Sequence, residues 1–252
     1  MDFLTIDGQL LDFQYIHEAM LRRVKVRLSA NVLQKVQDNR AYLDNKMQDP
    51  KAIIYGINTG FGSLCNVRIS DDNLGKLQEN LVLSHACGMG DLVPTELCRL
   101  IHLLKIINLS HGYSGIRVEL LQKLIDIYNA GIVPVIFQQG SLGASGDLAP
   151  LAHLSLMLLG KGKVYYKGEM LETAAALAQE NISPISLKSK EGLALLNGTQ
   201  FSLAYATKIV VEAKALFHLA NRISALSMEG FVCDIAPFDH LLHDIRPHEG
   251  QL

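Results

Sequence analysis

The residues best placed to do chemistry lie in one glycine-rich run, Gly143-Ala144-Ser145-Gly146-Asp147. This run follows an apolar extended stretch over 132–137 and precedes a segment typical of a helix. It departs from the Gly-x-Ser-x-Gly pattern of a hydrolase at its last residue, Asp147. Its glycines, at Gly140, Gly143 and Gly146, do not have the spacing of a dinucleotide fingerprint. An anion-binding helix start and a simple chain reversal both remain open as interpretations.

The three central residues also allow a different chemistry. Ser145 can lose its hydroxyl as water, and the Gly146 nitrogen can then attack the Ala144 carbonyl carbon, whose oxygen leaves as a second water. Glycine tolerates the backbone dihedrals that such a ring needs, and alanine adds little bulk. The product is a methylidene-imidazolone ring with an exposed electrophilic carbon. Because no side chain is a comparable electrophile, such a ring would open chemistry that otherwise requires a cofactor.

Four segments resemble one known family, in the family's own order. Residues Gly143–His153 resemble the signature of the aromatic amino acid ammonia-lyases and aminomutases. Tyr55–Gly62 is similar to their mobile tyrosine loop, and Glu191–Thr199 to their asparagine segment. Arg246–Gln251 resembles a further family stretch. The resemblance therefore extends from residue 55 to the end of the chain.

The resemblance implies a role for each matching residue. Ala144, Ser145 and Gly146 would form a 4-methylidene-imidazol-5-one autocatalytically, with no external cofactor and no metal. Tyr55 would remove the β-proton of the amino acid substrate, and Asn197 would hold the substrate carboxylate or orient the ring. Whether the ring captures the substrate through its amine or through its imidazole is left open.

The pair Ser84-His85 bears on the substrate. Family members that deaminate L-histidine to trans-urocanate and ammonia resemble this chain here, whereas members that act on tyrosine or phenylalanine tend to carry His-Leu or Phe-Leu. An imidazole at His85 suits hydrogen bonding to a substrate imidazole, which an apolar pocket would leave unsatisfied. L-Histidine is therefore the expected substrate. A tyrosine or phenylalanine ammonia-lyase, or an aminomutase, remains the alternative within the family.

Composition narrows the class of protein. The 252 residues carry 23 Lys and Arg against 25 Asp and Glu, so the net charge of −2 gives no electrostatic case for a nucleic-acid partner. No apolar run approaches the roughly 18 residues of a membrane span, and the N-terminal sequence lacks a signal peptide. The chain is expected in the cytoplasm with reduced cysteines. His240-x-x-His243 lacks the further ligands of a zinc site.

The patterning predicts a mainly α fold, with a single helical portion over 1–252 and a small β-hairpin at 164–169. The predicted helices cover 29–47, 70–88, 94–107, 117–130, 147–160 and 200–228. The last has apolar residues on several sides, which is typical of a bundle helix, in this case one between subunits. The resemblance implies a homotetramer and covers only the N-terminal half of the family's chain. Because further site residues would come from the other half, we expect little or no lyase activity from these 252 residues alone.

Two alternatives lie outside the family. A serine hydrolase would use Ser145 as nucleophile, with His153 or His85 as base. A non-catalytic helical assembly module would be built around the long helix over 200–228. A hydrolase would react with serine-directed phosphonates, and an assembly module would tolerate Ser145→Ala.

Overall fold

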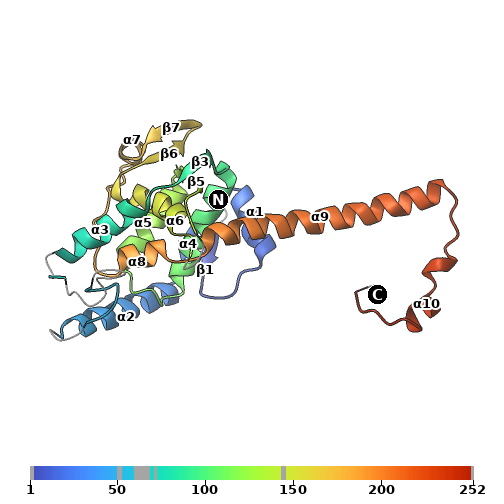
Figure 1. The fold of residues 1–252 in the computed structure, drawn as a ribbon, viewed down its shortest axis with the longest axis horizontal. Helices are drawn as coiled ribbons and strands as arrows, with labels where there is room; N and C mark the ends of the chain where they lie inside the picture. Colours follow the sequence, from blue (N-terminus) through green and yellow to red (C-terminus); the bar gives the residue numbers. More distant parts are fainter. Residues whose placement is uncertain (1–2, 50–52, 60–68, 71–72, 143–145, 251–252) are drawn as a thin grey trace. The chain divides into compact units, whose positions relative to one another are not determined.

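The computed structural model describes residues 3–49, 53–59, 69–70, 73–142 and 146–250 (Figure 1). The contacts of the chain divide it into two units, Met1–Lys208 and Ile209–Leu252. The division falls inside one continuous helix, α9 (Gln200–Gly230). The expectation of a single helical portion over the whole chain stays a prediction.

The first unit is mainly helical, as the patterning predicts. Its helices are α1 (Phe13–Leu21), α2 (Ala30–Met47), α3 (Leu74–His85), α4 (Thr95–Ser110), α5 (Val118–Asn129), α6 (Leu148–Leu156), α7 (Thr173–Gln179), α8 (Glu191–Leu196) and the start of α9. A 3-10 turn, η3 (Met157–Leu159), continues α6 and ends at Gly160, whose left-handed backbone closes the helix. The predicted N-cap of α2 is confirmed, because the Ser29 side chain accepts the Val32 N–H at 3.3 Å.

Short strands complete the first unit. They are β1 (Phe3–Ile6), β2 (Lys25–Leu28), β3 (Met89–Leu92), β4 (Val133–Pro134), β5 (Phe137–Gln139), β6 (Lys163–Tyr166) and β7 (Glu169–Glu172). β1 and β2 pair in parallel, β3 pairs with β5, and the antiparallel order β4-β6-β7 contains the predicted hairpin. The sequence did not predict the pairing of β1 with β2 or of β3 with β5, because strands of four residues or fewer are too short to show a clear alternation of apolar and polar residues.

Helix α4 forms the centre of the core. The sequence predicts one inner face for it, yet Leu100, Ile101 and Leu103 are all fully buried, as are the polar residues His102 and Lys105. The reason is that α1, α2, α5 and β4 all pack against α4, so little of its circumference reaches solvent.

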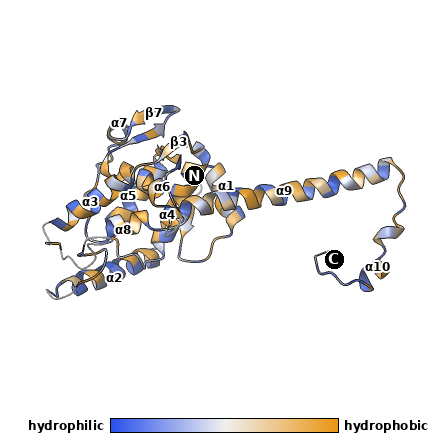
Figure 2. Cartoon of the chain, viewed as in Figure 1, coloured by the Kyte–Doolittle hydropathy of each residue, from blue (hydrophilic) through white to orange (hydrophobic). Residues whose placement is uncertain are grey.

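The second unit comprises the rest of α9, a 3-10 turn η4 (Ala236–Phe238) and α10 (His240–Asp244). Many of its large apolar side chains are exposed in this chain: Ile209, Val210, Leu216, Phe217, Leu219, Ile223, Leu226, Phe231, Val232, Ile235, Phe238, Leu241, Leu242 and Ile245. Figure 2 shows apolar positions recurring along α9 to its end. Within the described residues, no helix combines the length and the apolar character needed to cross a membrane.

Candidate active site

The start of α6 shows why a glycine stands at position 146. Residues 143–145, which include the predicted ring residues Ala144 and Ser145, lie outside the described residues. Gly146 is described and has φ +123°. A Cβ at this position would lie 2.7 Å from the Gly198 carbonyl oxygen and 2.9 Å from the Gly198 nitrogen. Both its conformation and its close approach to another backbone therefore require glycine.

Asp147 joins the start of α6 to two other elements. Its backbone N–H donates to the Gly198 carbonyl at 2.8 Å. Its buried carboxylate accepts the Ser202 N–H at 2.9 Å and the Ser202 hydroxyl at 2.8 Å. The sequence predicts that Asp147 begins the helix that contains Pro150, and α6 does begin at Leu148. The Asp147 side chain, however, satisfies a free N–H in the first turn of α9 and makes no capping bond to α6.

Asn197 lies at the C-terminal end of α8. Its side chain is exposed, and Nδ2 donates to the Leu193 carbonyl at 3.1 Å. Its backbone carbonyl accepts from the Lys105 amine of α4 at 3.0 Å. The next residue, Gly198, carries the carbonyl that binds Asp147, so the predicted residues Asn197 and Gly146 belong to one backbone junction.

His85 is the last residue of α3 and is half-buried. Its Nδ1 lies 2.8 Å from the Leu81 carbonyl and 3.2 Å from the Ser84 hydroxyl. A carbonyl can only accept, so this contact assigns the proton to Nδ1 and leaves Nε2 as an acceptor. Helix α3 packs against both α6 and α8, which brings His85 to the same three-helix group as Gly146 and Asn197.

His153 of α6 ties the segment after α3 to this group. Its Nε2 accepts the Gly88 N–H at 2.9 Å, and its ring contacts the Phe137 ring edge-on at a centroid distance of 5.1 Å. Burial lowers the pKa of His153. Because its acceptor nitrogen is already used by the backbone, His153 is poorly suited to be the base of a serine hydrolase.

Tyr55 lies in a turn that is stabilised by hydrogen bonds between its own residues. The Ile54 N–H donates to the Asn58 side chain at 2.7 Å, and the Gly56 N–H donates to the Thr59 hydroxyl at 3.2 Å. Asn58 and Thr59 are buried, whereas Tyr55 is 56% exposed. Neither bond links Tyr55 to the junction of Gly146 and Asn197. The rest of the tyrosine loop, residues 60–62, lies outside the described residues.

A buried ion pair that the sequence analysis missed supports the start of α8. Glu191 is fully buried, and Arg117 donates to it from Nε at 2.9 Å and from a terminal nitrogen at 2.8 Å. The same carboxylate accepts the backbone N–H groups of Arg117 at 3.0 Å and Lys188 at 2.7 Å. The bonded Glu191 carboxylate raises the pKa of Arg117. This pair therefore fixes the helix that ends at Asn197.

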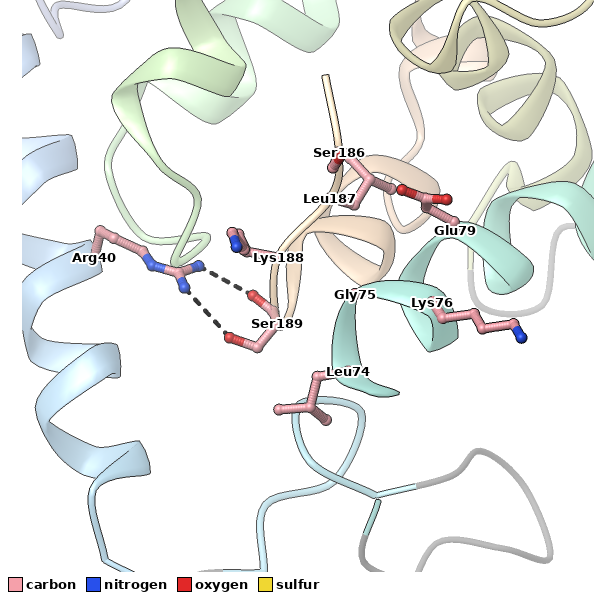
Figure 3. Close-up of a pocket in the computed structure, with 9 residues that line it drawn as sticks. All are labelled: Arg40, Leu74, Gly75, Lys76, Glu79, Ser186, Leu187, Lys188 and Ser189. Carbon is pink, nitrogen blue, oxygen red and sulfur yellow. Dashed lines mark hydrogen bonds between the residues drawn. The ribbon is translucent and has the colours of Figure 1, made fainter. Parts of the chain in front are cut away.

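Arg40 of α2 holds the segment that leads into α8. It donates to the Ser189 carbonyl at 3.0 Å and to the Ser189 hydroxyl at 3.3 Å (Figure 3). These residues line a cavity of about 550 Å³ that also includes Gly75 and Glu79 of α3. None of the described residues of the candidate active site lines this cavity. In the part of the chain that the structure describes, no group of three or more His, Cys, Asp or Glu side chains is arranged to hold a metal ion.

The chain matches the family described as aromatic amino acid lyase over residues 11–252. It is 43% identical to a histidine ammonia-lyase of Streptococcus pyogenes over 99% of this chain and 48% of that protein. A histidine ammonia-lyase from Trypanosoma cruzi superposes with a TM-score of 0.91 at 34% identity, covering 99% of this chain and 49% of the other. A phenylalanine aminomutase from Pantoea agglomerans gives a TM-score of 0.91 at 35% identity, covering 98% and 47%.

The fold and the sequence thus place this chain in one class, that of the aromatic amino acid lyases and the aminomutases that share their fold. The chain belongs to the aromatic amino acid lyase family and is similar to histidine ammonia-lyases. It spans about half the length of the relatives that it matches.

Proposed function

We propose that this chain supplies part of a site that eliminates ammonia from L-histidine to give trans-urocanate, together with the further site residues that the family resemblance implies. The observation that carries the proposal is the junction at Gly146, where the last residue of the Ala144-Ser145-Gly146 triad lies against the turn that follows Asn197. The 43% identity to a histidine ammonia-lyase over nearly the whole chain favours histidine among the family's substrates.

The described end of the triad fits a ring formed from these residues. Ring closure needs a nitrogen at position 146 with unusual backbone dihedrals, and Gly146 has φ +123° in a space that would not admit a Cβ. When formed, the methylidene-imidazolone supplies an electrophilic carbon that captures the substrate and so makes its amine a better leaving group.

The other residues act on the substrate directly. Tyr55, with its exposed phenol, would remove the β-proton as general base. The exposed amide of Asn197 would hold the substrate carboxylate or orient the ring. His85, with Nδ1 engaged by the Leu81 carbonyl, would accept a hydrogen bond from the substrate imidazole at Nε2.

We also propose that the protein works as a homotetramer in the cytoplasm. The exposed apolar side chains along α9 and α10 support an oligomer, because a surface of this character is stabilised by contact with other subunits. The same argument leaves the helical assembly module as a rival, which the experiment below separates from a lyase.

Intact-mass spectrometry of the purified chain tests the ring. We expect a mass lower than the sequence mass by two water molecules, and no such loss in Ser145→Ala. Ser155→Ala is the matched control, because its buried hydroxyl donates only to the Leu151 carbonyl within α6, and it should keep the loss. An unmodified mass in the unaltered chain would refute the proposal and leave the assembly module.

Binding experiments test the substrate. L-Histidine should shift the ring-proton NMR signals of His85 at lower concentration than L-tyrosine or L-phenylalanine, because only histidine carries a ring N–H for Nε2. His85→Leu should remove this preference. Equal binding of the three amino acids would contradict the assignment of histidine, whereas substantial urocanate production by these 252 residues alone would contradict the need for further site residues.

A further inference from the structure

Lys105 is a fully buried lysine in the middle of α4. It is 0% exposed, between the buried residues Leu104 and Ile106. Lysine is almost never fully buried without a charged partner. Desolvation alone lowers the pKa of Lys105, to about 7, and within the described residues no carboxylate forms a salt bridge with it.

The amine has a specific acceptor. Lys105 Nζ donates to the Asn197 carbonyl at 3.0 Å, and among the described residues this is its one hydrogen-bond partner. That carbonyl stands at the C-terminal end of α8, where the helix dipole favours a positive charge. A methionine would fill the same space with no desolvation cost, so the packing of the core by itself does not require an amine.

Three backbone groups connect Lys105 to the ring-forming triad: the Asn197 carbonyl, the Gly198 carbonyl and the Asp147 N–H. The next carbonyl, that of Gly198, accepts the Asp147 N–H at 2.8 Å. The same carbonyl lies 2.7 Å from the position that a Cβ of Gly146 would occupy. The Gly198 nitrogen belongs to the same peptide as the Asn197 carbonyl and lies 2.9 Å from that Cβ position. A rotation of the Asn197–Gly198 peptide would therefore change the contact at Gly146.

We propose that Lys105 is a positioning residue of the candidate active site, whose buried amine fixes the Asn197–Gly198 turn and thereby sets the backbone at Gly146. The role in the reaction rests on the proposed function. The mechanical role, holding the turn, does not depend on it. Lys105 touches neither the ring residues described here nor a substrate, so it acts through Asn197 and Gly198.

The test compares the full chain with Lys105→Met, which removes the donor, and Lys105→Arg, which retains one. Cys98→Ala is the control, because Cys98 is equally buried in α4 and its thiol contacts the Val93 carbonyl, away from the turn. Three quantities are measured: amide hydrogen exchange at Asp147, the NMR shift of the Gly198 amide nitrogen, and the fraction of chain that has lost two waters.

In Lys105→Met we expect the Asp147 amide hydrogen to exchange about tenfold faster, after correction for any change in the global free energy of unfolding. The reason is that the Gly198 carbonyl, which accepts this hydrogen, is no longer held in place. The Gly198 shift should move, the dehydrated fraction should fall, and Lys105→Arg should restore part of each. Cys98→Ala should lower the melting temperature without these three changes.

Unchanged exchange and an unchanged Gly198 shift in Lys105→Met would overturn the inference. A failure of Lys105→Met to fold would also overturn it, since Lys105 would then serve core stability. If the unaltered chain loses no water, the proposed function fails, and exchange at Asp147 still decides whether Lys105 holds the turn.

Discussion

Replacing Glu191 by glutamine tests whether the buried ion pair fixes α8. The substitution keeps the side-chain shape but removes the charge, and its amide group would face Arg117 or the Lys188 N–H, both of which are donors. Removing one partner of a buried pair costs about 3–5 kcal/mol. The Arg117 side chain is 23% exposed and can regain some hydration, so we expect the lower end, about 3 kcal/mol.

The assay is unfolding of the full chain, followed by circular dichroism with urea and with heat. About 3 kcal/mol corresponds to a fall in melting temperature of about 6–12 °C for a domain of this size. Glu18→Gln is the control, because its pair with Arg22 is exposed and should contribute less than about 1 kcal/mol. A Glu191→Gln chain that unfolds within 0.5 kcal/mol of the unaltered chain, on the order of a surface substitution, would refute the reasoning.

Three further predictions concern pH, packing and catalysis. Burial lowers the pKa of His102 from 6.5 to about 3. Below pH 6.5 the unfolded chain therefore binds a proton that the folded chain does not, so the free energy of unfolding decreases as the pH is lowered. In urea unfolding between pH 6 and 4, His102→Phe should reduce this slope by about 1.4 kcal/mol per pH unit; an unchanged slope would show that His102 does not titrate on unfolding. A Cβ at Gly192 would lie 2.6 Å from the Gln78 carbonyl, so Gly192→Ala should lower the free energy of unfolding in urea by about 1–3 kcal/mol. Gly230→Ala is the control, because a Cβ there meets nothing within 4 Å and should not lower the free energy of unfolding. When these residues act together with the further site residues that the family resemblance implies, Tyr55→Phe should abolish urocanate formation, because the phenol oxygen that would take the β-proton is lost; full activity in that variant, followed by urocanate absorbance, would exclude Tyr55 as base.

Much of the helical architecture could be predicted from local signals. Ser29 begins α2 as its cap, and α5 begins and ends within one residue of the predicted 117–130. The long uninterrupted stretch from Gln200 gives α9, two residues longer than predicted. These signals depend on residues close in sequence, such as caps, glycines and apolar spacing, and a sequence reports them directly.

The contacts that build the site could not be predicted in the same way. Asp147 caps α9 through Ser202, 55 residues further along the chain, and Lys105 binds Asn197 across 92 residues. Nothing in the local pattern around Asp147 distinguishes a cap of its own helix from a cap of another. Lys105 did leave a signal, a single charge within the apolar run 103–107, but that signal carries no information on its acceptor.

The bonds of Asp147 restrict where the chain can change in length. Its backbone N–H donates to the Gly198 carbonyl, and its carboxylate accepts from Ser202. Because both bonds must form at once, the number of residues between Gly198 and Ser202 is fixed. One residue inserted between them would turn the first turn of α9 by about 100° and carry the serine away from the carboxylate. Insertions in the turn between β6 and β7, where Gly168 has open space around it, would disturb nothing comparable. Homologous chains should therefore differ in length at that hairpin and keep an invariant count of residues from Gly198 to Ser202.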